Sequence, residues 1–157
     1  TGQPDAALDG VYKLAVAHGE PRIKISESLA KTTLPGRKQV HRYIAGDGQF
    51  LGVDGIAAQD EAAPVRLVHP FEEHKSMRTA GIASEPLLRP VMTGGRRVGA
   101  PPPLAEAKAR AAARLVRLPA EYLRFENPHG YKVGISEALH AQRERLRRQR
   151  NQPGEGT

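Results

Sequence analysis

The sequence predicts an α+β fold in which antiparallel β-hairpins come first and helices follow, and two observations point to it. In residues 1–100, stretches that alternate apolar and polar side chains are separated by short turns that contain glycine. After the proline run at 101–103, apolar residues recur at helical spacing. We therefore expect a β-rich part over 1–100 and a helical part over 101–150, with a disordered tail at 151–157.

The first hairpin is predicted over residues 11–25, where alternating stretches flank the turn signal His18-Gly19. With a two-residue loop, Lys13 lies opposite Lys24 and the apolar side chains share the other face of the hairpin. A four-residue loop would instead place Lys24 opposite Ala15. The pattern leaves both registers open, and the position of the lysines depends on which one the chain adopts.

Basic side chains on this hairpin suggest an anion site. Like charges opposite each other on paired strands destabilise the pair unless something neutralises them, and Lys13, Lys24 and Arg22 would share one face. A loop turned by Pro35-Gly36 then adds further basic residues, Lys31, Arg37 and Lys38. The alternative is a solvated face on a basic protein, which is common for lysines.

The next predicted elements are a single helical turn and a second hairpin. Ser26 is placed to start the turn, which would run to Lys31. Residues 39–44 and 50–57 are strand-like, and the loop that joins them contains Asp47-Gly48, a strong hairpin signal. The second hairpin therefore follows directly on the basic loop.

Before the helices we expect a short strand at 65–68, a polar surface excursion at 70–85 and a third hairpin. Residues 87–92 and 96–98 form this hairpin around a loop that contains two glycines. A glycine pair is a weak signal for a phosphate loop, because the lysine and the following Ser or Thr of nucleotide-binding loops are missing. We interpret it as a turn.

The helical part begins with a predicted helix at 104–118, which Pro119 ends. Its apolar side chains form one stripe, made of Leu104, Ala107, Ala111 and Leu115. A shorter helical piece follows at 120–125, and residues 131–133 are expected to be extended.

The last helix is predicted from Glu137 to about Arg150, with Ser136 as its cap and with Leu139 and Leu146 facing inward. It is rich in arginine, with Arg143, Arg145, Arg147, Arg148 and Arg150. A basic helix can bind RNA or another polyanion, so a free-standing polyanion-binding module is the alternative function. No aromatic platform accompanies the arginines, and we do not expect nucleic acid as the partner.

Composition narrows the class of protein. The chain has 157 residues, a net charge of +7 and 39% hydrophobic residues, which is enough for one domain with an aliphatic core. It has no cysteine, so it forms no disulfide and offers no thiolate to a metal. The sequence lacks an apolar run of about 18 residues and does not open with a charged and then apolar leader, so we expect neither a membrane span nor a signal peptide.

Residue types that often serve catalysis or metal binding occur without a recognisable motif. His69 and His74 flank Glu72 and Glu73, but we expect a solvated loop here, because zinc sites usually show tighter ligand spacing on a defined element. Asp54 has the chemistry of a general base, yet a single acid without a recognisable partner is usually a turn residue. We therefore predict no metal site and no catalytic residue from these positions.

An ordered series of motifs makes the chain resemble the C-terminal third of the nicotinate phosphoribosyltransferases, a type II phosphoribosyltransferase family. The motifs are GVYKL (10–14), PRIKISE (21–27), KTTLPGRK (31–38), EPLLRPVM (85–92), LP (118–119) and NPHGYKVGISE (127–137). They extend over nearly the whole chain, and such a series is far more specific than any one of its members.

The resemblance implies an enzyme that forms nicotinate mononucleotide and pyrophosphate from nicotinate and phosphoribosyl pyrophosphate, with ATP hydrolysis through a phosphorylated histidine. It implies an irregular α/β barrel upstream of this segment and a second α/β domain to which both 1–100 and 101–150 would belong. It also implies ATP and Mg²⁺ as cofactors of the complete enzyme, with none bound by this chain alone, a homodimer, and a cytoplasmic location.

The resemblance places the catalytic histidine and the glycine-rich phosphate loops at positions before Thr1, so we expect no catalytic residue in this segment and an inactive isolated chain. In the related nicotinamide phosphoribosyltransferases, lysines of the corresponding hairpin and loop contact phosphates. By similarity these are Lys13, Lys24 and Lys31, with Arg22 and Lys38 as weaker candidates. The charge pattern and the resemblance thus suggest the same anion site.

Overall fold

The computed structural model describes residues 13–24, 26 and 32–151, without the side chains of residues 150 and 151. The predicted helical turn after Ser26 and the tail from residue 152 onward lie outside these residues. Among the helices of the described part, none combines the length and the apolar character that crossing a membrane requires.

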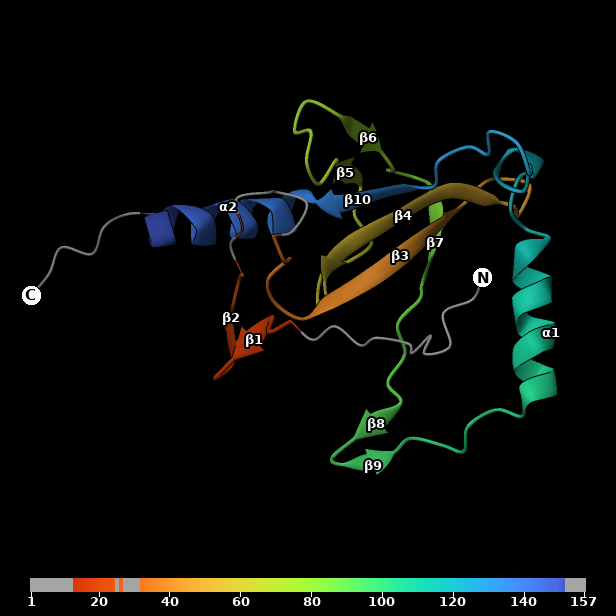
Figure 1. The fold of residues 1–157 in the computed structure, drawn as a ribbon, viewed down its shortest axis with the longest axis horizontal. Coiled ribbons are helices and arrows are strands. Elements are labelled where there is room, and N and C mark those ends of the chain that lie inside the picture. The colour runs from red at the N-terminus through yellow and green to blue at the C-terminus, as the bar shows by residue number, and fades with distance from the viewer. Residues whose placement is uncertain (1–12, 25, 27–31, 152–157) are drawn as a thin grey trace, which may run out of the picture.

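Six strands of the described residues form one mixed sheet in the order β6-β5-β10-β4-β3-β7 (Figure 1). They are β3 (Lys38–Ile44), β4 (Phe50–Ala58), β5 (Arg66–Val68), β6 (Ser76–Arg78), β7 (Ala83–Pro86) and β10 (Lys132–Ser136). The antiparallel pair β3 and β4 confirms the second hairpin, and β5 confirms the short strand.

Strand β10 brings the C-terminal part of the chain into the middle of the sheet. It pairs in parallel with β4, with Lys132 opposite Val53 and Ile135 opposite Ile56, and antiparallel with β5. The extended stretch expected at 131–133 is therefore a central strand. The β-rich and helical parts of the chain share one sheet.

The expectation that 70–85 is only a surface excursion is wrong. Strands β6 and β7 lie within it, and they form the two edges of the sheet. An edge strand pairs on one side only and exposes its other side to water, so its sequence stays polar. The apolar pattern that identifies inner strands is missing here for that reason.

In the part of the chain that the structure describes, two small hairpins lie outside the main sheet. In the first, β1 (Val16–Ala17) pairs with β2 (Glu20–Pro21), which confirms the two-residue loop. His18 and Gly19 both have positive φ, 53° and 78°, as a type I′ turn requires. In the second, β8 (Met92–Thr93) pairs with β9 (Arg96–Arg97) around two glycines with positive φ, which confirms the turn.

The helices of the described residues are α1 (Leu104–Leu115), the 3₁₀ turn η2 (Ala120–Tyr122) and α2 (Glu137–Asn151). Helix α1 is shorter than predicted, because the chain tightens into i to i+3 hydrogen bonds at Arg117 and Leu118 before Pro119. The predicted cap of α2 is confirmed: the Leu139 N–H donates to the Ser136 hydroxyl at 3.1 Å.

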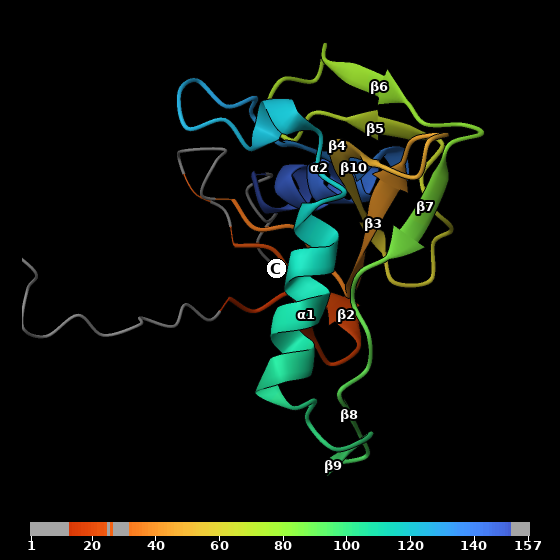
Figure 2. The ribbon, with the colours of Figure 1, turned by 90° about the vertical axis from the view of Figure 1, so that its right-hand side faces the viewer.

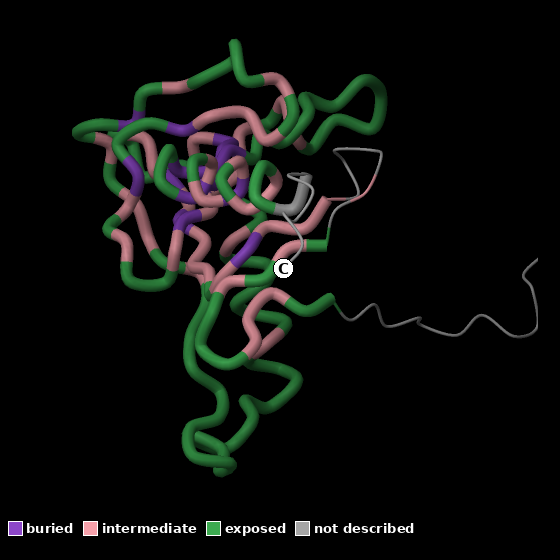
Figure 3. The backbone as a smooth tube through the Cα atoms, turned by 90° about the vertical axis from the view of Figure 1, so that its left-hand side faces the viewer, coloured by how far each residue is buried: buried purple, intermediate pink, exposed green. Residues whose placement is uncertain are grey.

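The core lies along the central strands and where α2 packs on them (Figure 3). Tyr43, Val53 and Leu67 form a cluster in it, and the Tyr43 hydroxyl donates to the Pro64 carbonyl at 2.6 Å. Ile135 and Leu139 are fully buried. The phenol of Tyr43 is thus satisfied inside an otherwise apolar cluster.

A glycine in β4 allows η2 to pack on the sheet. Gly52 has a φ of +73°, and a Cβ atom there would lie 2.0 Å from the hydroxyl oxygen of Tyr122. No side chain fits that space. The segment that leads into β10 therefore lies directly on the β4 backbone.

Buried His41 predicts that stability depends on pH. Burial lowers the pKa of His41 below its ordinary value of 6.5, although the charge of Glu61 opposes the shift. Between the lowered pKa and 6.5 the unfolded chain binds more protons than the folded one, so the free energy of unfolding falls as pH falls through this window. His41→Gln should flatten this slope in urea unfolding at pH 7.5 to 5.

The control for this experiment is His18→Gln, in the exposed turn of the first hairpin. The quantity compared is the pH slope rather than the absolute stability, since either substitution can shift the latter. Equal slopes for the wild type and His41→Gln would show that His41 does not contribute.

Candidate functional site

The predicted basic hairpin is held against the loop that follows it. The Ala15 carbonyl accepts hydrogen bonds from the N–H groups of Arg22, at 2.8 Å, and Gly36, at 2.9 Å. The Lys24 N–H donates to the Thr33 hydroxyl at 2.8 Å, and the Thr33 N–H donates back to the Lys24 carbonyl at 3.3 Å. The backbone of Lys24 is therefore fixed between the hairpin and the loop.

The candidate side chains differ in what surrounds them. Lys13, Arg22 and Lys24 are exposed, and Lys31 lies outside the described residues. The amino group of Lys38 donates to two carbonyls of its own loop, Leu34 at 2.9 Å and Gly36 at 2.5 Å, and burial lowers its pKa.

These surroundings set what each cation can do. The exposed side chains of Lys13, Arg22 and Lys24 are positive charges displayed on a braced backbone, which suits the binding of an anion. The amino group of Lys38 instead holds the loop in place through the loop carbonyls that it binds. A groove of about 730 Å³ lies between the hairpin and α2. Its lining includes Val16, Arg37 and Gln142.

A cluster of arginines around Phe50 was not found by sequence reasoning. The guanidinium carbons of Arg42, Arg114 and Arg117 lie 5.0, 5.0 and 4.3 Å from the centre of the Phe50 ring. Each also has an oxygen partner: Arg114 pairs with Glu85, and Arg117 donates to the Gly48 carbonyl at 3.0 Å. Hydrogen bonds from Arg114 hold the pKa of Glu85 below its ordinary value.

Arg42 binds Asp54 through two parallel hydrogen bonds, Nε to Oδ1 at 3.0 Å and Nη2 to Oδ2 at 2.8 Å. The Tyr131 hydroxyl donates to the same carboxylate at 2.9 Å. Burial, together with Asp54, raises the pKa of Tyr131 to about 12. The three residues come from β3, β4 and the segment before β10, and they fasten the start of β10 to the second hairpin.

This network corrects the interpretation of Asp54. It is a buried strand residue with three donors, so it is neither a turn residue nor a free general base. The pair was not predictable from the turn, because the register of β3 and β4 shifts between Arg42 and Ile44, and this shift brings Arg42 opposite Asp54. Opposite charges that face each other on paired strands stabilise the pair.

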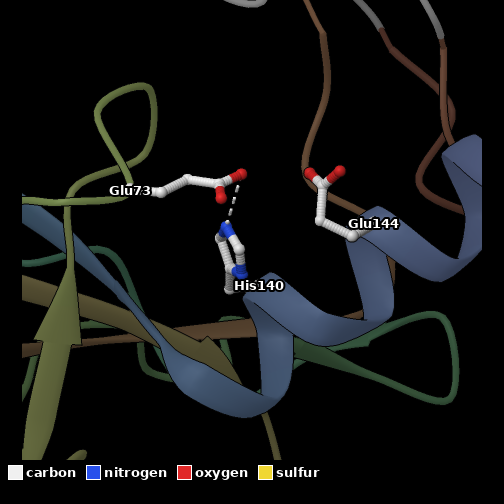
Figure 4. A group of neighbouring side chains, drawn as sticks. All are labelled: Glu73, His140 and Glu144. Carbon is white, nitrogen blue, oxygen red and sulfur yellow. Dashed lines mark ion pairs between the residues drawn. The ribbon is translucent and has the colours of Figure 1, made fainter.

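The histidines and glutamates at positions 69–74 do not form one group in the structure. His69 and His74 lie 3.8 and 4.0 Å from Glu72, whereas Glu73 turns towards His140 at 3.4 Å (Figure 4). Together with Glu144, Glu73 and His140 offer one ring nitrogen and two carboxylate oxygens within 4.8 Å of one another. Imidazole and carboxylate are zinc ligands in proteins.

Glu144 is engaged by two other side chains in this group. It accepts from Arg143 at 3.0 Å and from Arg147 at 2.9 Å. Burial raises its pKa, but the hydrogen bonds from Arg147 and Arg143 outweigh this effect and lower it. Its negative charge is thus neutralised by arginine.

The arginine-rich helix is in part a structural element. Arg143 is buried, and it donates to the Pro70 carbonyl at 2.7 Å, which anchors the loop after β5 to α2. Arg147 is bound to Glu144, whereas Arg145 and Arg148 are exposed. Two of the arginines that suggested a polyanion-binding helix are therefore committed to contacts within the fold.

The pair between Arg42 and Asp54 should be a large contributor to stability. Asp54→Asn leaves the Arg42 charge without its counter-ion in a mostly buried position, so we expect the free energy of unfolding to fall by about 3 kcal/mol in urea. Arg66→Gln removes the exposed pair with Glu137 and should cost less than about 1 kcal/mol. Equal losses would mean that burial does not strengthen the first pair.

Comparison with known proteins finds a family model and several relatives that match this chain. The family model "Nicotinate phosphoribosyltransferase C-terminal domain" matches residues 37–143. Nicotinate phosphoribosyltransferase from Homo sapiens is 38% identical over 141 residues, which cover 86% of this chain and 26% of that protein. The protein of the same name from Dictyostelium discoideum is 31% identical over 151 residues, covering 88% and 26%.

A solved structure agrees with the sequence comparisons. The crystal structure of human nicotinic acid phosphoribosyltransferase superposes with a TM-score of 0.70 at 35% identity, over 89% of this chain and 27% of that one. The chain thus spans about a quarter of the length of the relatives it matches. The resemblance read from the motifs is confirmed, and the chain belongs to the nicotinate phosphoribosyltransferase C-terminal domain family.

Proposed function

We propose that this chain supplies the C-terminal portion of a nicotinate phosphoribosyltransferase in the synthesis of NAD. The complete enzyme would join nicotinate to phosphoribosyl pyrophosphate, release pyrophosphate, and couple the step to ATP hydrolysis with Mg²⁺. The observation that carries the proposal is the family match over 37–143, on a fold shared with the human enzyme.

The rest of that enzyme would be polypeptide that corresponds to the other three-quarters of the length of the relatives. We assign to it the barrel, the catalytic histidine and the loops that hold the ribose phosphate. No described residue of this chain is proposed as catalytic. We further propose a homodimer that works in the cytoplasm.

Within this function, Lys13, Lys24 and Lys31 are proposed to contact phosphate groups. When the bond between the ribosyl carbon and pyrophosphate breaks, negative charge grows on the leaving group, and a nearby ammonium group stabilises it. The exposed positions of Lys13 and Lys24 on a braced hairpin fit a phosphate ligand. Arg22 is exposed as well and fits a supporting role, whereas Lys38 fits less well because carbonyls hold its amino group.

The proposal predicts activity only in a mixture. The probe is the human enzyme without the C-terminal segment that this chain matches, combined with this chain, nicotinate, phosphoribosyl pyrophosphate, ATP and Mg²⁺. Nicotinate mononucleotide, measured by chromatography, should form with both proteins and with neither alone. Absence of product from two folded and associated proteins would reject the proposed reaction.

Lys24→Ala tests the phosphate role in that reconstituted enzyme. Turnover at saturating substrate should fall about tenfold or more, because the lost charge stabilises the leaving group as the bond breaks. Thermal unfolding should not change, since the backbone of Lys24, rather than its side chain, makes the contacts with Thr33. The matched control is Lys132→Ala, which removes another exposed lysine at the start of β10.

Unchanged turnover for Lys24→Ala would remove this side chain from the site. Equal losses for Lys24→Ala and Lys132→Ala would indicate a general effect of positive charge rather than a phosphate contact.

A further inference from the structure

Residues 88–116 form an arm that stands away from the sheet. The arm leaves the sheet after β7, contains the hairpin of β8 and β9, and continues into α1, and both ribbon views show these elements outside the layers of the main sheet (Figures 1 and 2). Every residue of the arm is exposed except Ala107 and Arg114, which are half-buried. The arm therefore has no core of its own.

Large apolar side chains are exposed along the whole arm. Six of them are Leu88, Val91, Met92, Val98, Leu104 and Leu115, with between 52% and 75% of their surface accessible. The predicted apolar stripe of α1 is part of this surface, and it contacts no core. A two-stranded hairpin or a 12-residue helix is marginal in water without such packing, so this surface requires a cover.

The base of the arm is fixed even though the arm itself is exposed. The Phe50 N–H donates to the Arg117 carbonyl at 2.7 Å, and Arg117 donates in turn to the Gly48 carbonyl. At the same end, Arg114 pairs with Glu85 of β7. At the other end, the Leu88 N–H donates to Gln39 Oε1 at 2.9 Å, and Gln39 Nε2 donates to the Leu88 carbonyl at 3.0 Å. Both ends of the arm are thus attached to strands of the sheet, which presents it in one direction and lowers the ordering cost of docking.

The charge of the arm indicates the chemistry of its partner. Its exposed basic residues are Arg89, Arg96, Arg97, Lys108 and Arg110, and its one acidic residue is Glu106. A surface that covers the arm must therefore be apolar in its centre and acidic at its rim.

The comparison with the human enzyme indicates which partner this is. The superposition covers 89% of this chain, which is too much to omit the whole arm, and it uses only 27% of the human chain. At least part of the arm therefore has a counterpart in the human enzyme. Most of the polypeptide of that enzyme lies outside the portion that the two chains share. We propose that the arm is the docking surface for that other portion, an inference that rests on the proposed function and adds the contact surface to it.

The test measures binding of this chain to the truncated human enzyme by isothermal titration calorimetry. The variant Val91→Asp/Leu104→Asp places two charges on the apolar surface of the arm and should weaken binding about tenfold or more, because each carboxylate would lose its water in the complex. The matched control is Val65→Asp, at a valine that is 64% exposed outside the arm, and it should bind like the wild type.

The variants should unfold like the wild type, since Val91 and Leu104 are each 75% exposed in the free chain. Equal binding by the arm variant and the wild type would overturn the inference. So would self-association of this chain through the arm, seen by light scattering and lost in the arm variant, if the truncated enzyme does not bind.

The same mixture separates the inference from the proposed function. Binding that depends on the arm but yields no nicotinate mononucleotide supports the docking surface and rejects the reaction. Product formation that is insensitive to the arm variant supports the reaction and rejects the docking surface.

Discussion

The parallel pairing of β10 with β4 is the constraint on which the rest of the fold depends. Parallel neighbours cannot be joined by a tight turn, so the chain must cross over between the end of β4 and the start of β10. This crossover holds β5, β6, β7, the arm and η2. Once β10 is in place, Ser136 caps α2 and directs it onto the sheet, where Leu139 is buried.

The arginines near Phe50 hold this crossover in position. Arg42 and Asp54 would pair in any antiparallel hairpin of this register, but the Tyr131 hydroxyl also binds Asp54 and so attaches the segment before β10. Arg114 and Arg117 attach the base of the arm to the same region. The ring of Phe50 therefore lies where the arm returns to the sheet. It also lies beside the pair of Arg42 and Asp54, which holds the segment before β10.

The sequence predicted the features whose causes are local. The turns at His18-Gly19 and Gly94-Gly95 follow from the positive φ angles that these residues adopt, and the Ser136 cap follows from its place before an apolar repeat. Strands β6 and β7 were missed because edge strands carry no apolar alternation. The contact between Tyr131 and Asp54 joins residues 77 positions apart, which periodicity cannot reveal.

The basic hairpin and the arm lie on the same side of the sheet in both ribbon views (Figures 1 and 2). A body that docks on the arm would therefore also approach the hairpin that displays Lys13 and Lys24. The phosphate role proposed for these lysines would then be completed by the docked body, because the described residues do not enclose their side chains. Solvated lysines bind anions weakly, whereas a docked surface that excludes water strengthens their field on a phosphate group. In this proposal, the arm would set where the partner sits, and the position of the partner would determine how strongly the lysines act.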